Sequence, residues 1–199
     1  MTRSLTLSGE RRRTEILDAA LRCFDRQGVT ATTIEDIRAE SGASIGSIYH
    51  QFASKDEILT HLYCQAVSAY GAGLTKALRS KRHPKQGLRA GVEFHVRWID
   101  VHRPLARIML HWDESELSVA GQEMLREEAK RFSKELGLWL REAVASGAIR
   151  SMTPELYAAL FIGPLLEYGR RMVRDTAIAD EGHRELADGI WRALDTDRP

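Results

Sequence analysis

Three histidines lie within a short part of the chain and are the first candidates for metal or acid–base chemistry. They are His95, His102 and His111, separated by seven and nine residues. Zinc sites built on helices place histidines about one turn apart or combine them with cysteines, and neither arrangement occurs here. The spacing therefore argues against a metal site. Because His95 and His102 share a helix face, a hydrogen bond that responds to pH or to a ligand remains an open alternative.

The sequence contains no combination of side chains that is typical of catalysis. Serines, histidines and carboxylates are scattered, and no glycine-rich phosphate loop or metal motif occurs. We therefore predict that the protein is not an enzyme and uses no cofactor. A helical enzyme domain is the least favoured alternative, and it would require a turnover that depends on one of the three histidines.

A different chemistry is indicated by the stretch SGASIGSIYHQFASKDEIL, residues 41–59. A turn that contains glycine is followed there by a helix whose first two turns carry Ser44, Gly46 and Ser47. Glycine inside a helix costs about 1 kcal/mol relative to alanine, so its presence needs a reason. Small residues at this position would let another molecule come close to the backbone.

The elements that carry this stretch are predicted to be amphipathic helices. Apolar residues recur three and four apart in nearly every segment, prolines are few and alternating strand patterns are absent, so we predict an all-α fold of about nine helices. The first helix begins at about Glu10 and stops at Gly28. Thr33 caps the second helix, Gly42 ends it, and Ser44 caps the third.

Two short helices joined by about four residues predict a helix-turn-helix at about residues 33–52. Ile48 and Phe52 are expected to be the buried pair of its second helix. A long helix follows, with Ser54 and Glu57 as its capping box. These elements define a three-helix DNA-binding domain over residues 10–65 and leave residues 66–199 as a second helical domain.

The second domain is predicted from the same periodicity. The basic, proline-containing stretch at residues 79–87 interrupts the pattern. Thr153 and Pro154 mark a helix start, and Gly147 marks a helix end. The expected helices cover about residues 86–102, 104–113, 117–146, 154–174 and 181–195.

Composition limits the functions that this chain can have. It has 199 residues, 43% hydrophobic and 29% charged, with a net charge of +1, so any binding of nucleic acid must use a local patch. No apolar run is long enough for a membrane span or a secretory signal, which predicts a cytoplasmic protein without a membrane partner. Cys23 and Cys64 lack metal spacing and are expected to be reduced packing residues.

In a helix-turn-helix, the second helix lies in the major groove of DNA and the first crosses the backbone. Small residues at the start of the second helix would let base edges and phosphates approach. Tyr49, His50 and Lys55 have the chemistry to reach phosphate oxygens, and Ile45 can contact a thymine methyl group or simply be exposed. The predicted DNA-binding residues are Thr33, Ser44, Ile45, Gly46, Ser47, Tyr49, His50 and Lys55.

This region resembles the DNA-binding segment of the tetracycline-repressor (TetR) family, over about residues 10–65. The resemblance rests on TTIEDIRAESGASIGSIYHQFASKDEIL and on the helix stop at Gly28. The matching residues are Thr33, Ile37, Gly42, Ser44, Gly46, Tyr49, Phe52, Lys55 and Leu59. Arg38 departs from the family, which usually has a small residue there. Its side chain is expected either to extend to a phosphate or to change the angle between the two helices.

The resemblance implies a homodimer that binds a partly palindromic operator in double-stranded DNA. A two-fold protein reads half-sites about 34–36 Å apart, or a multiple of that distance. The resemblance further implies a repressor that a small, largely apolar effector releases from DNA by binding the second domain. The alternative is a regulator, either a repressor or an activator, that a protein partner controls without a small-molecule effector.

Aromatic and methionine side chains are concentrated in residues 86–175, where a pocket for an amphipathic ligand could form. Each of them alone is ordinary core material, so the pocket rests mainly on the resemblance. The predicted effector-binding residues are Phe94, His95, Trp98, Met109, Trp112 and Phe161.

The helix expected at residues 154–174 is apolar on two sides, which predicts that it is buried on two sides. The resemblance implies that this helix and the last one form a four-helix bundle with their copies in the dimer. A core within one chain is the open alternative. Gly163 and Pro164 are expected to kink the first of the two helices. The predicted dimerisation residues are Leu165, Tyr168, Met172, Ile190, Trp191 and Leu194.

Overall fold

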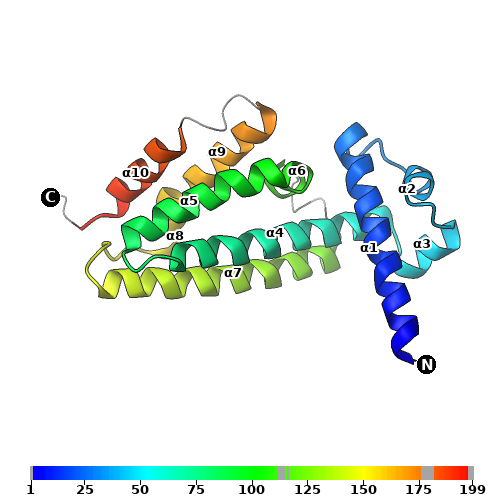
Figure 1. Cartoon of the computed structure of the whole chain (residues 1–199), viewed down its shortest axis with the longest axis horizontal. Coiled ribbons are helices and arrows are strands. Elements are labelled where there is room, and N and C mark those ends of the chain that lie inside the picture. Colours follow the sequence, from blue (N-terminus) through cyan, green and yellow to red (C-terminus); the bar gives the residue numbers. More distant parts are fainter. Residues whose placement is uncertain (1, 112–114, 116, 176–181, 197–199) are drawn as a thin grey trace. The chain divides into compact units, whose positions relative to one another are not determined.

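The computed structural model describes residues 2–111, 115, 117–175 and 182–196, and these residues are mostly helical (Figure 1). The predicted all-α class is confirmed. Within this part of the chain the single β-type contact is an isolated bridge between Ile149 and Asp195, which ties the end of the last helix to the turn at Gly147. No helix among these residues combines the length and the apolar character that crossing a membrane requires.

The helices follow one another in an order that matches the sequence prediction, with shifts at several ends. They are α1 Thr2–Gln27, α2 Ile34–Ser41, α3 Ile45–Gln51, α4 Lys55–Arg79, α5 Pro84–Val101, α6 Arg103–His111, α7 Val119–Ala145, α8 Pro154–Tyr157, the π-helical turn η2 Ala158–Ile162, α9 Gly163–Arg174 and α10 His183–Leu194.

The chain forms two compact units. One contains the residues up to Gln65 together with the segment that ends at Leu125, and the other contains Ala66–His111 and the chain from Arg126 onward. The start of α7 therefore belongs with the first unit, although the sequence placed all residues after 65 in the second domain. Gly121 of this segment lies close to Thr60, because a Cβ atom on Gly121 would be 2.7 Å from the Thr60 hydroxyl oxygen.

The first unit is a small helical core built from α1, α2, α3 and the start of α4. Ile48 and Phe52 are fully or almost fully buried, which confirms the predicted pair. Their partners are buried side chains of the neighbouring helices. These are Ile16, Ala19, Ala20, Cys23, Phe24, Ile37, Ile58, Leu59 and Leu62.

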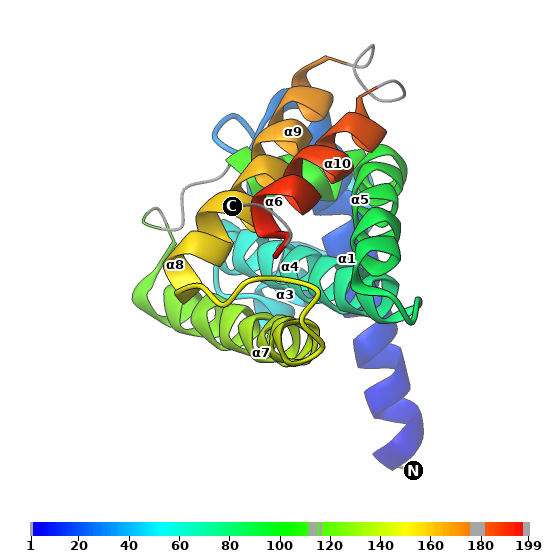
Figure 2. The same ribbon diagram turned by 90° about the vertical axis from the view of Figure 1, so that its left-hand side faces the viewer.

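The second unit has its own core, in which α4 and α7 lie side by side and α5, α9 and α10 form a second layer over them (Figures 1 and 2). Two glycines of α5 allow it to approach α4 closely. A Cβ atom on Gly87 would lie 2.3 Å from the Leu78 carbonyl oxygen, and one on Gly91 would lie 2.9 Å from the Leu78 side chain.

The helix that begins at Pro154 is interrupted as the sequence predicted. Thr153 caps it by accepting a hydrogen bond from the Leu156 amide, and the five-residue π-helical turn η2 follows at Ala158–Ile162. There the Gly163 amide donates to the Ala158 carbonyl, five residues back, because Pro164 has no amide hydrogen to continue the α-helical ladder.

Candidate nucleic-acid interface

The turn between α2 and α3 has the geometry that its residues require. Gly42 adopts a left-handed conformation with φ of 64°, and its amide donates to the Arg38 carbonyl at 3.0 Å. Glycine reaches this conformation without the steric cost that a side chain adds. Ala43 is buried beneath the turn, and its amide donates to the Ser41 hydroxyl at 3.2 Å. The turn therefore fixes the direction in which α3 leaves α2.

Both helices are capped by side chains, as predicted. The Thr33 hydroxyl accepts from the Asp36 amide, and the Asp36 carboxylate accepts from the Thr33 amide at 2.8 Å, which completes a capping box. The bond from the Thr33 amide, followed by a bond that the Thr33 hydroxyl donates to the same carboxylate, lowers the pKa of Asp36. Ser44 caps α3 by accepting from the Ser47 amide at 3.1 Å, and this bond leaves the hydroxyl hydrogen of Ser44 available to another acceptor.

The outward side of α3 presents small and polar groups to solvent. Ser44, Gly46 and His50 are exposed, and nothing lies within 4 Å of the position of a Cβ atom on Gly46. Ile45 is 42% exposed and Tyr49 is 53% exposed, so neither is a core residue. A surface without bulky side chains at the start of a helix is what close approach to a base edge needs.

Lys55 has a different position from the one that the sequence predicted. Its ammonium group donates to the backbone carbonyl oxygens of Val29 at 2.8 Å, Thr30 at 3.3 Å and Thr32 at 2.7 Å. An ammonium group has three hydrogens, and all three are used in tying the loop before α2 to the start of α4. No hydrogen of the Lys55 ammonium group is therefore left to donate to a DNA phosphate.

Thr33 also has less freedom than the sequence suggested. Its hydroxyl hydrogen is directed to the Asp36 carboxylate at 2.7 Å, inside the capping box. Arg38 points outward, with its side chain 43% exposed, and pairs with Glu35 at 2.6 Å. The bulk of Arg38 therefore lies outside the packing of α2 against α3, and its guanidinium stays at the surface.

The predicted effector residues are for the most part core residues of the second unit. His95 and Phe161 are fully buried, Trp98 is nearly so, and Phe94 and Met109 are partly buried. Trp112 lies outside the described residues. This arrangement is a packed cluster rather than an open pocket.

His95 is the polar centre of this cluster. Its Nδ1 atom is 2.7 Å from the Tyr70 hydroxyl, whereas Nε2 has no hydrogen-bond partner among the described residues. Burial lowers the pKa of His95 to about 4, and the Leu165 backbone opposes this shift. Gly169 of α9 packs on the ring, because a Cβ atom there would lie 3.1 Å from Nε2. No sequence pattern indicates the pairing of Tyr70 with His95, since it depends on how α4 packs against α5.

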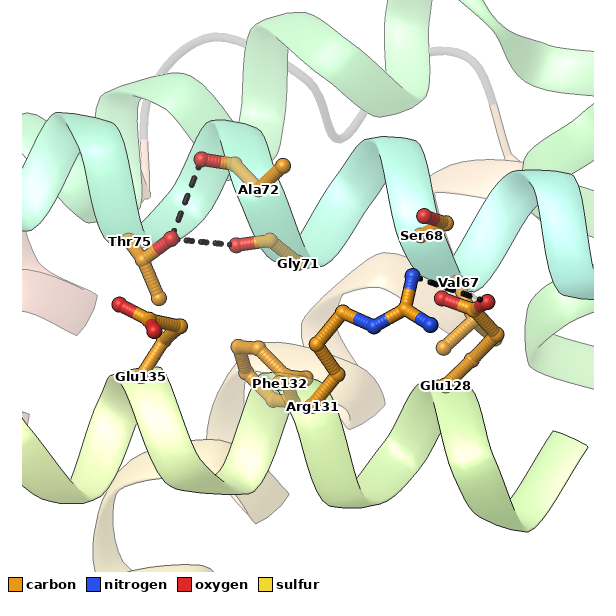
Figure 3. Close-up of a pocket in the computed structure, with 9 residues that line it drawn as sticks. All are labelled: Val67, Ser68, Gly71, Ala72, Thr75, Glu128, Arg131, Phe132 and Glu135. Atoms are coloured by element: carbon orange, nitrogen blue, oxygen red, sulfur yellow. Dashed lines mark hydrogen bonds and ion pairs between the residues drawn. The ribbon is translucent and has the colours of Figure 1, made fainter.

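Two hollows in the second unit lie away from this cluster. One, of about 90 Å³, is a slot between α4 and α7 in which Phe132 packs against Gly71 and Arg131 pairs with Glu128 (Figure 3). The other, of about 470 Å³, lies between α5 and α10 and has charged walls that include the ion pair of Arg89 with Asp188. Neither is lined by a predicted effector residue.

Most of the predicted dimerisation residues face the core of their own chain. Leu165, Met172, Ile190, Trp191 and Leu194 are all buried within one protomer, and Tyr168 is partly buried. A side chain buried in one chain is not available to a second copy. The apolar stripe of α9 and α10 was assigned to the wrong interface, because periodicity shows that a face is buried but not what buries it.

The fold and this surface define a class of protein: an all-helical, helix-turn-helix protein whose second helix presents small residues to a groove of DNA. Comparison with known sequences agrees. A family model described as "Bacterial regulatory proteins, tetR family" matches residues 16–62. The DNA-binding unit is therefore of the type found in the TetR family of bacterial regulatory proteins.

Individual relatives extend the comparison beyond the DNA-binding unit. The transcriptional regulator HbdR of Aromatoleum sp. (strain CIB) is 26% identical over 147 residues, which cover 74% of this chain but only 64% of HbdR. The transcriptional repressor KstR2 of Mycobacterium tuberculosis (strain ATCC 25618 / H37Rv) is 27% identical over 168 residues, which cover 83% of this chain and 77% of KstR2.

A solved structure shows the same fold over nearly the whole length. The regulator FadR from Bacillus subtilis, in complex with stearoyl-CoA, superposes with a TM-score of 0.75 and covers 94% of this chain and 99% of that chain. Its sequence identity is 19%. At this level the likeness concerns the arrangement of helices in both units.

Proposed function

We propose that this protein is a homodimeric transcriptional repressor that binds a palindromic operator through α3 of each protomer and leaves it when a small, largely apolar effector binds the second unit. The observation that carries the proposal is the exposed start of α3, where small residues stand beside the outward side chains of Ile45 and Tyr49. The relatives HbdR and KstR2 are regulators of transcription, which supports it. Such a protein acts in the cytoplasm.

The contacts with DNA are assigned from the exposed groups of α3. Gly46 admits the sugar-phosphate backbone or a base edge, and Ser44 donates its free hydroxyl hydrogen to a phosphate. Tyr49 and His50 reach phosphate oxygens one turn later, and Ile45 contacts a thymine methyl group. Ser47 lies beside Ile45 and Gly46, where its hydroxyl can bond to a base edge.

The dimer uses the outward side of the chain from α8 through η2 and α9, together with that of α10, opposite to the predicted residues. Leu156 is 47% exposed, and Leu160, Leu166 and Leu186 are only partly covered by the core. Gly189 faces open space. Partly exposed apolar side chains next to a small residue suit close packing of a helix pair against its own copy.

The effector site is assigned to the cluster around His95. An unpartnered Nε2 atom among aromatic side chains offers one directional hydrogen bond to an otherwise apolar ligand. The FadR structure contains stearoyl-CoA, which combines a long apolar acyl chain with a polar coenzyme A group. Because the cluster is packed, the effector must bind a second arrangement of these helices more tightly than the first. The change that it causes in the free energy of DNA binding is set by the difference between its binding free energies for the two arrangements.

The same packing favours a second candidate, which is a regulator controlled by a protein partner without a small-molecule effector. The two candidates share the DNA interface and differ only in what the second unit binds. Thermal unfolding in the presence of acyl-CoA thioesters of different chain lengths separates them, since a ligand that binds only the folded state raises the melting temperature.

The test of the DNA interface is a selection of bound sequences from a random duplex library by purified protein. We expect the wild type to enrich a palindromic site. The Tyr49→Ala variant should no longer enrich this site, and the Ile45→Ala variant should prefer different bases within it. Val101→Ala is the matched control, because Val101 is 67% exposed on α5 of the second unit. Enrichment of no sequence, or of the same site by the Tyr49 variant with unchanged affinity, would contradict the proposal.

A further inference from the structure

The DNA-binding unit has few cations where its recognition helix needs them. Residues 1–65 contain eight Lys and Arg against nine Asp and Glu, and residues 39–54 contain no Lys or Arg. Affinity for DNA depends strongly on phosphates neutralised by lysine and arginine. The cations must therefore come from parts of the unit outside α3.

Several cationic side chains of this unit form contacts that stabilise its fold. The three hydrogens of Lys55 are directed to backbone carbonyls, and Arg22 and Arg26 share Glu40. Arg13 donates to the Gln51 carbonyl at 2.7 Å, and its guanidinium lies 4.2 Å from the centre of the Phe52 ring. These side chains join different helices or loops of the unit, so binding a phosphate would cost a contact that holds the unit together.

The N-terminal part of α1 is placed beside the end of the recognition helix. Gly9 and Arg13 both approach Gln51, the last residue of α3, with 4.0 Å between a Cβ atom on Gly9 and the Gln51 side-chain nitrogen. The helix begins at Thr2, well before the position near Glu10 that the sequence predicted. Its first residue in the buried core of the described chain is Ile16, and the preceding turns project past α3 in both views (Figures 1 and 2).

Arg11 and Arg12 sit on this projecting part and are only weakly engaged. They share the single carboxylate of Glu15, at 3.0 Å and 2.9 Å, with 84% and 43% of their side chains exposed. Exposed ion pairs of this kind contribute between zero and about 1 kcal/mol, so a phosphate can replace the carboxylate at little cost. Residues 2–15 contain four arginines against two glutamates, so this part of α1 carries a net positive charge.

We infer that the N-terminal part of α1 is a second DNA-contacting surface, where Arg11 and Arg12 bind the phosphates that flank the half-site read by α3. The inference rests on the proposed binding of DNA and adds a partner for these two exposed arginines. We expect this surface to increase the affinity for DNA without changing the sequence preference, because phosphate contacts position a protein on DNA without reading its bases.

The test compares two double variants of α1 in the full-length protein. Arg11→Gln with Arg12→Gln removes the two exposed cations that share Glu15 of α1, and Arg22→Gln with Arg26→Gln removes two other cations of α1 that share Glu40 of α2. Affinity is measured as a function of salt for the duplex that the wild type selects and for a random duplex of equal length. We expect the first variant to weaken both and to make the slope of log K against log salt shallower by about 1.8 per DNA-binding unit, since each phosphate contact contributes about 0.9. The control variant keeps the wild-type slope.

A deletion of residues 2–8 gives an independent measurement. These seven residues span about 10 Å of helix, or about 3 base pairs of duplex, so the hydroxyl-radical footprint is expected to shorten by that amount at each outer edge. An unchanged slope in the first variant, or an equal change in both double variants, overturns the inference. If the first variant keeps its slope but loses self-association in sedimentation, the surface binds a second copy instead.

The outcomes separate this inference from the proposed function. If the wild type selects a palindromic site and the Arg11 and Arg12 variant binds it with unchanged affinity and salt slope, only the inference fails. If the wild type binds neither the selected nor the random duplex, the proposed function itself fails, and the inference fails with it. Thermal unfolding of each variant confirms that it is folded in every comparison.

Discussion

Lys55 illustrates how a residue that fits a motif can serve the fold. Its ammonium group holds three backbone carbonyls of the loop before α2, two of them at 2.8 Å or less. We expect Lys55→Met to lower the free energy of unfolding by about 2 kcal/mol, because hydrogen bonds to charged groups contribute about 1.5–3 kcal/mol and the carbonyls lose their donor. Urea unfolding measures this loss. Lys76→Met, at an exposed position of the same helix, is the control and should leave stability unchanged.

The same variant tests the alternative role of Lys55. If Lys55 bound a phosphate, Lys55→Met would reduce the salt dependence of DNA binding by about 0.9 while stability stayed the same. We expect instead that Lys55→Met lowers stability and that the folded protein binds DNA with the same salt dependence as the wild type. A variant of full stability and reduced salt slope would show that the carbonyl contacts are replaced when DNA is bound.

His95 links stability to pH. Its folded pKa, about 4, lies below the ordinary histidine value of about 6.5, so the folded state binds the proton less tightly than the unfolded chain does. Its neutral form therefore gives full stability above about pH 6.5, and stability falls as the pH drops toward 4. Between pH 6.5 and 5 the wild type should lose about 2 kcal/mol through this one group.

The comparison with His95→Gln isolates this contribution from that of other histidines. Glutamine keeps an acceptor for the Tyr70 hydroxyl but cannot be protonated in this range. Denaturant unfolding at intervals between pH 7 and 5 should show a shallower decline for the variant, whatever its stability at neutral pH. Parallel declines of the two proteins would mean that His95 is protonated in the folded state and that the core around it admits water.

At the scale of single residues, the sequence predicted local relationships well. The caps by Thr33 and Ser44 and the burial of Ile48 and Phe52 involve neighbours within four residues, so spacing alone determines them. The carbonyl contacts of Lys55 join residues more than twenty positions apart and depend on packing that no local pattern contains.

At the scale of elements, Gly87 decides how closely α5 and α4 pack. The sequence assigned it to the end of a break in the pattern, because glycine usually ends helices. In the structure it lies inside α5, which begins at Pro84, and it faces the backbone of α4. A glycine that permits close approach looks the same in the sequence as one that stops a helix, and only the neighbouring helix distinguishes them.

We expect Gly87→Ala to destabilise the second unit by about 3 kcal/mol. The new methyl group would lie 2.3 Å from the Leu78 carbonyl oxygen, which is backbone and cannot turn aside, so the two helices must separate. Gly137→Ala on α7 is the matched control. Its methyl group would meet only the end of the Arg141 side chain at 3.4 Å, and the higher helix propensity of alanine should stabilise the protein by up to about 1 kcal/mol. Urea unfolding of both variants checks the difference in sign, and equal effects would mean that α5 can move away from α4 freely.

Helix ends show the same limit of local patterns. Thr153 and Pro154 start a helix as predicted, since the cap and the ring of proline act within one turn. The early start of α1 at Thr2 was missed, because the apolar residues among positions 2–8 are Leu5 and Leu7, and a spacing of two does not indicate a helix face. Periodicity detects helices through the surface that they bury, so it does not detect a projecting one.

At the scale of the whole molecule, the dimer interface was the least predictable feature. The sequence showed that the helix after Pro154 is apolar on two sides, and Leu165 and Met172 occupy the side that packs on its own chain. We propose that the other side, which includes the exposed Leu156 and the partly buried Leu160, packs on a second copy. Both sides are apolar at helical spacing, so choosing between them requires the positions of α5 and α10.

Gly189 provides the test of this interface. It lies on the outward side of α10, and nothing within 4 Å surrounds the position of its Cβ atom, so Gly189→Arg fits into a folded protomer. In a two-fold dimer the same patch of both copies meets, and the substitution would bring two bulky cations together in an apolar contact. We expect a monomer in sedimentation velocity at concentrations where the wild type is a dimer, with a cooperative unfolding transition that no longer depends on protein concentration. Gly137→Arg, which adds the same charge on α7, should stay dimeric.

The loss of the dimer has a consequence for DNA binding that separates it from a defect in the interface with DNA. A monomer keeps α3 and the arginines of α1, so Gly189→Arg should still bind a single half-site with the affinity of one wild-type DNA-binding unit. Its affinity for the full palindrome should fall at least tenfold, because the second half-site no longer binds at the high effective concentration that linkage to the first provides. A Gly189→Arg protein that remains dimeric, or a monomer that binds the palindrome as tightly as the wild type, would place the two-fold contact elsewhere on the molecule.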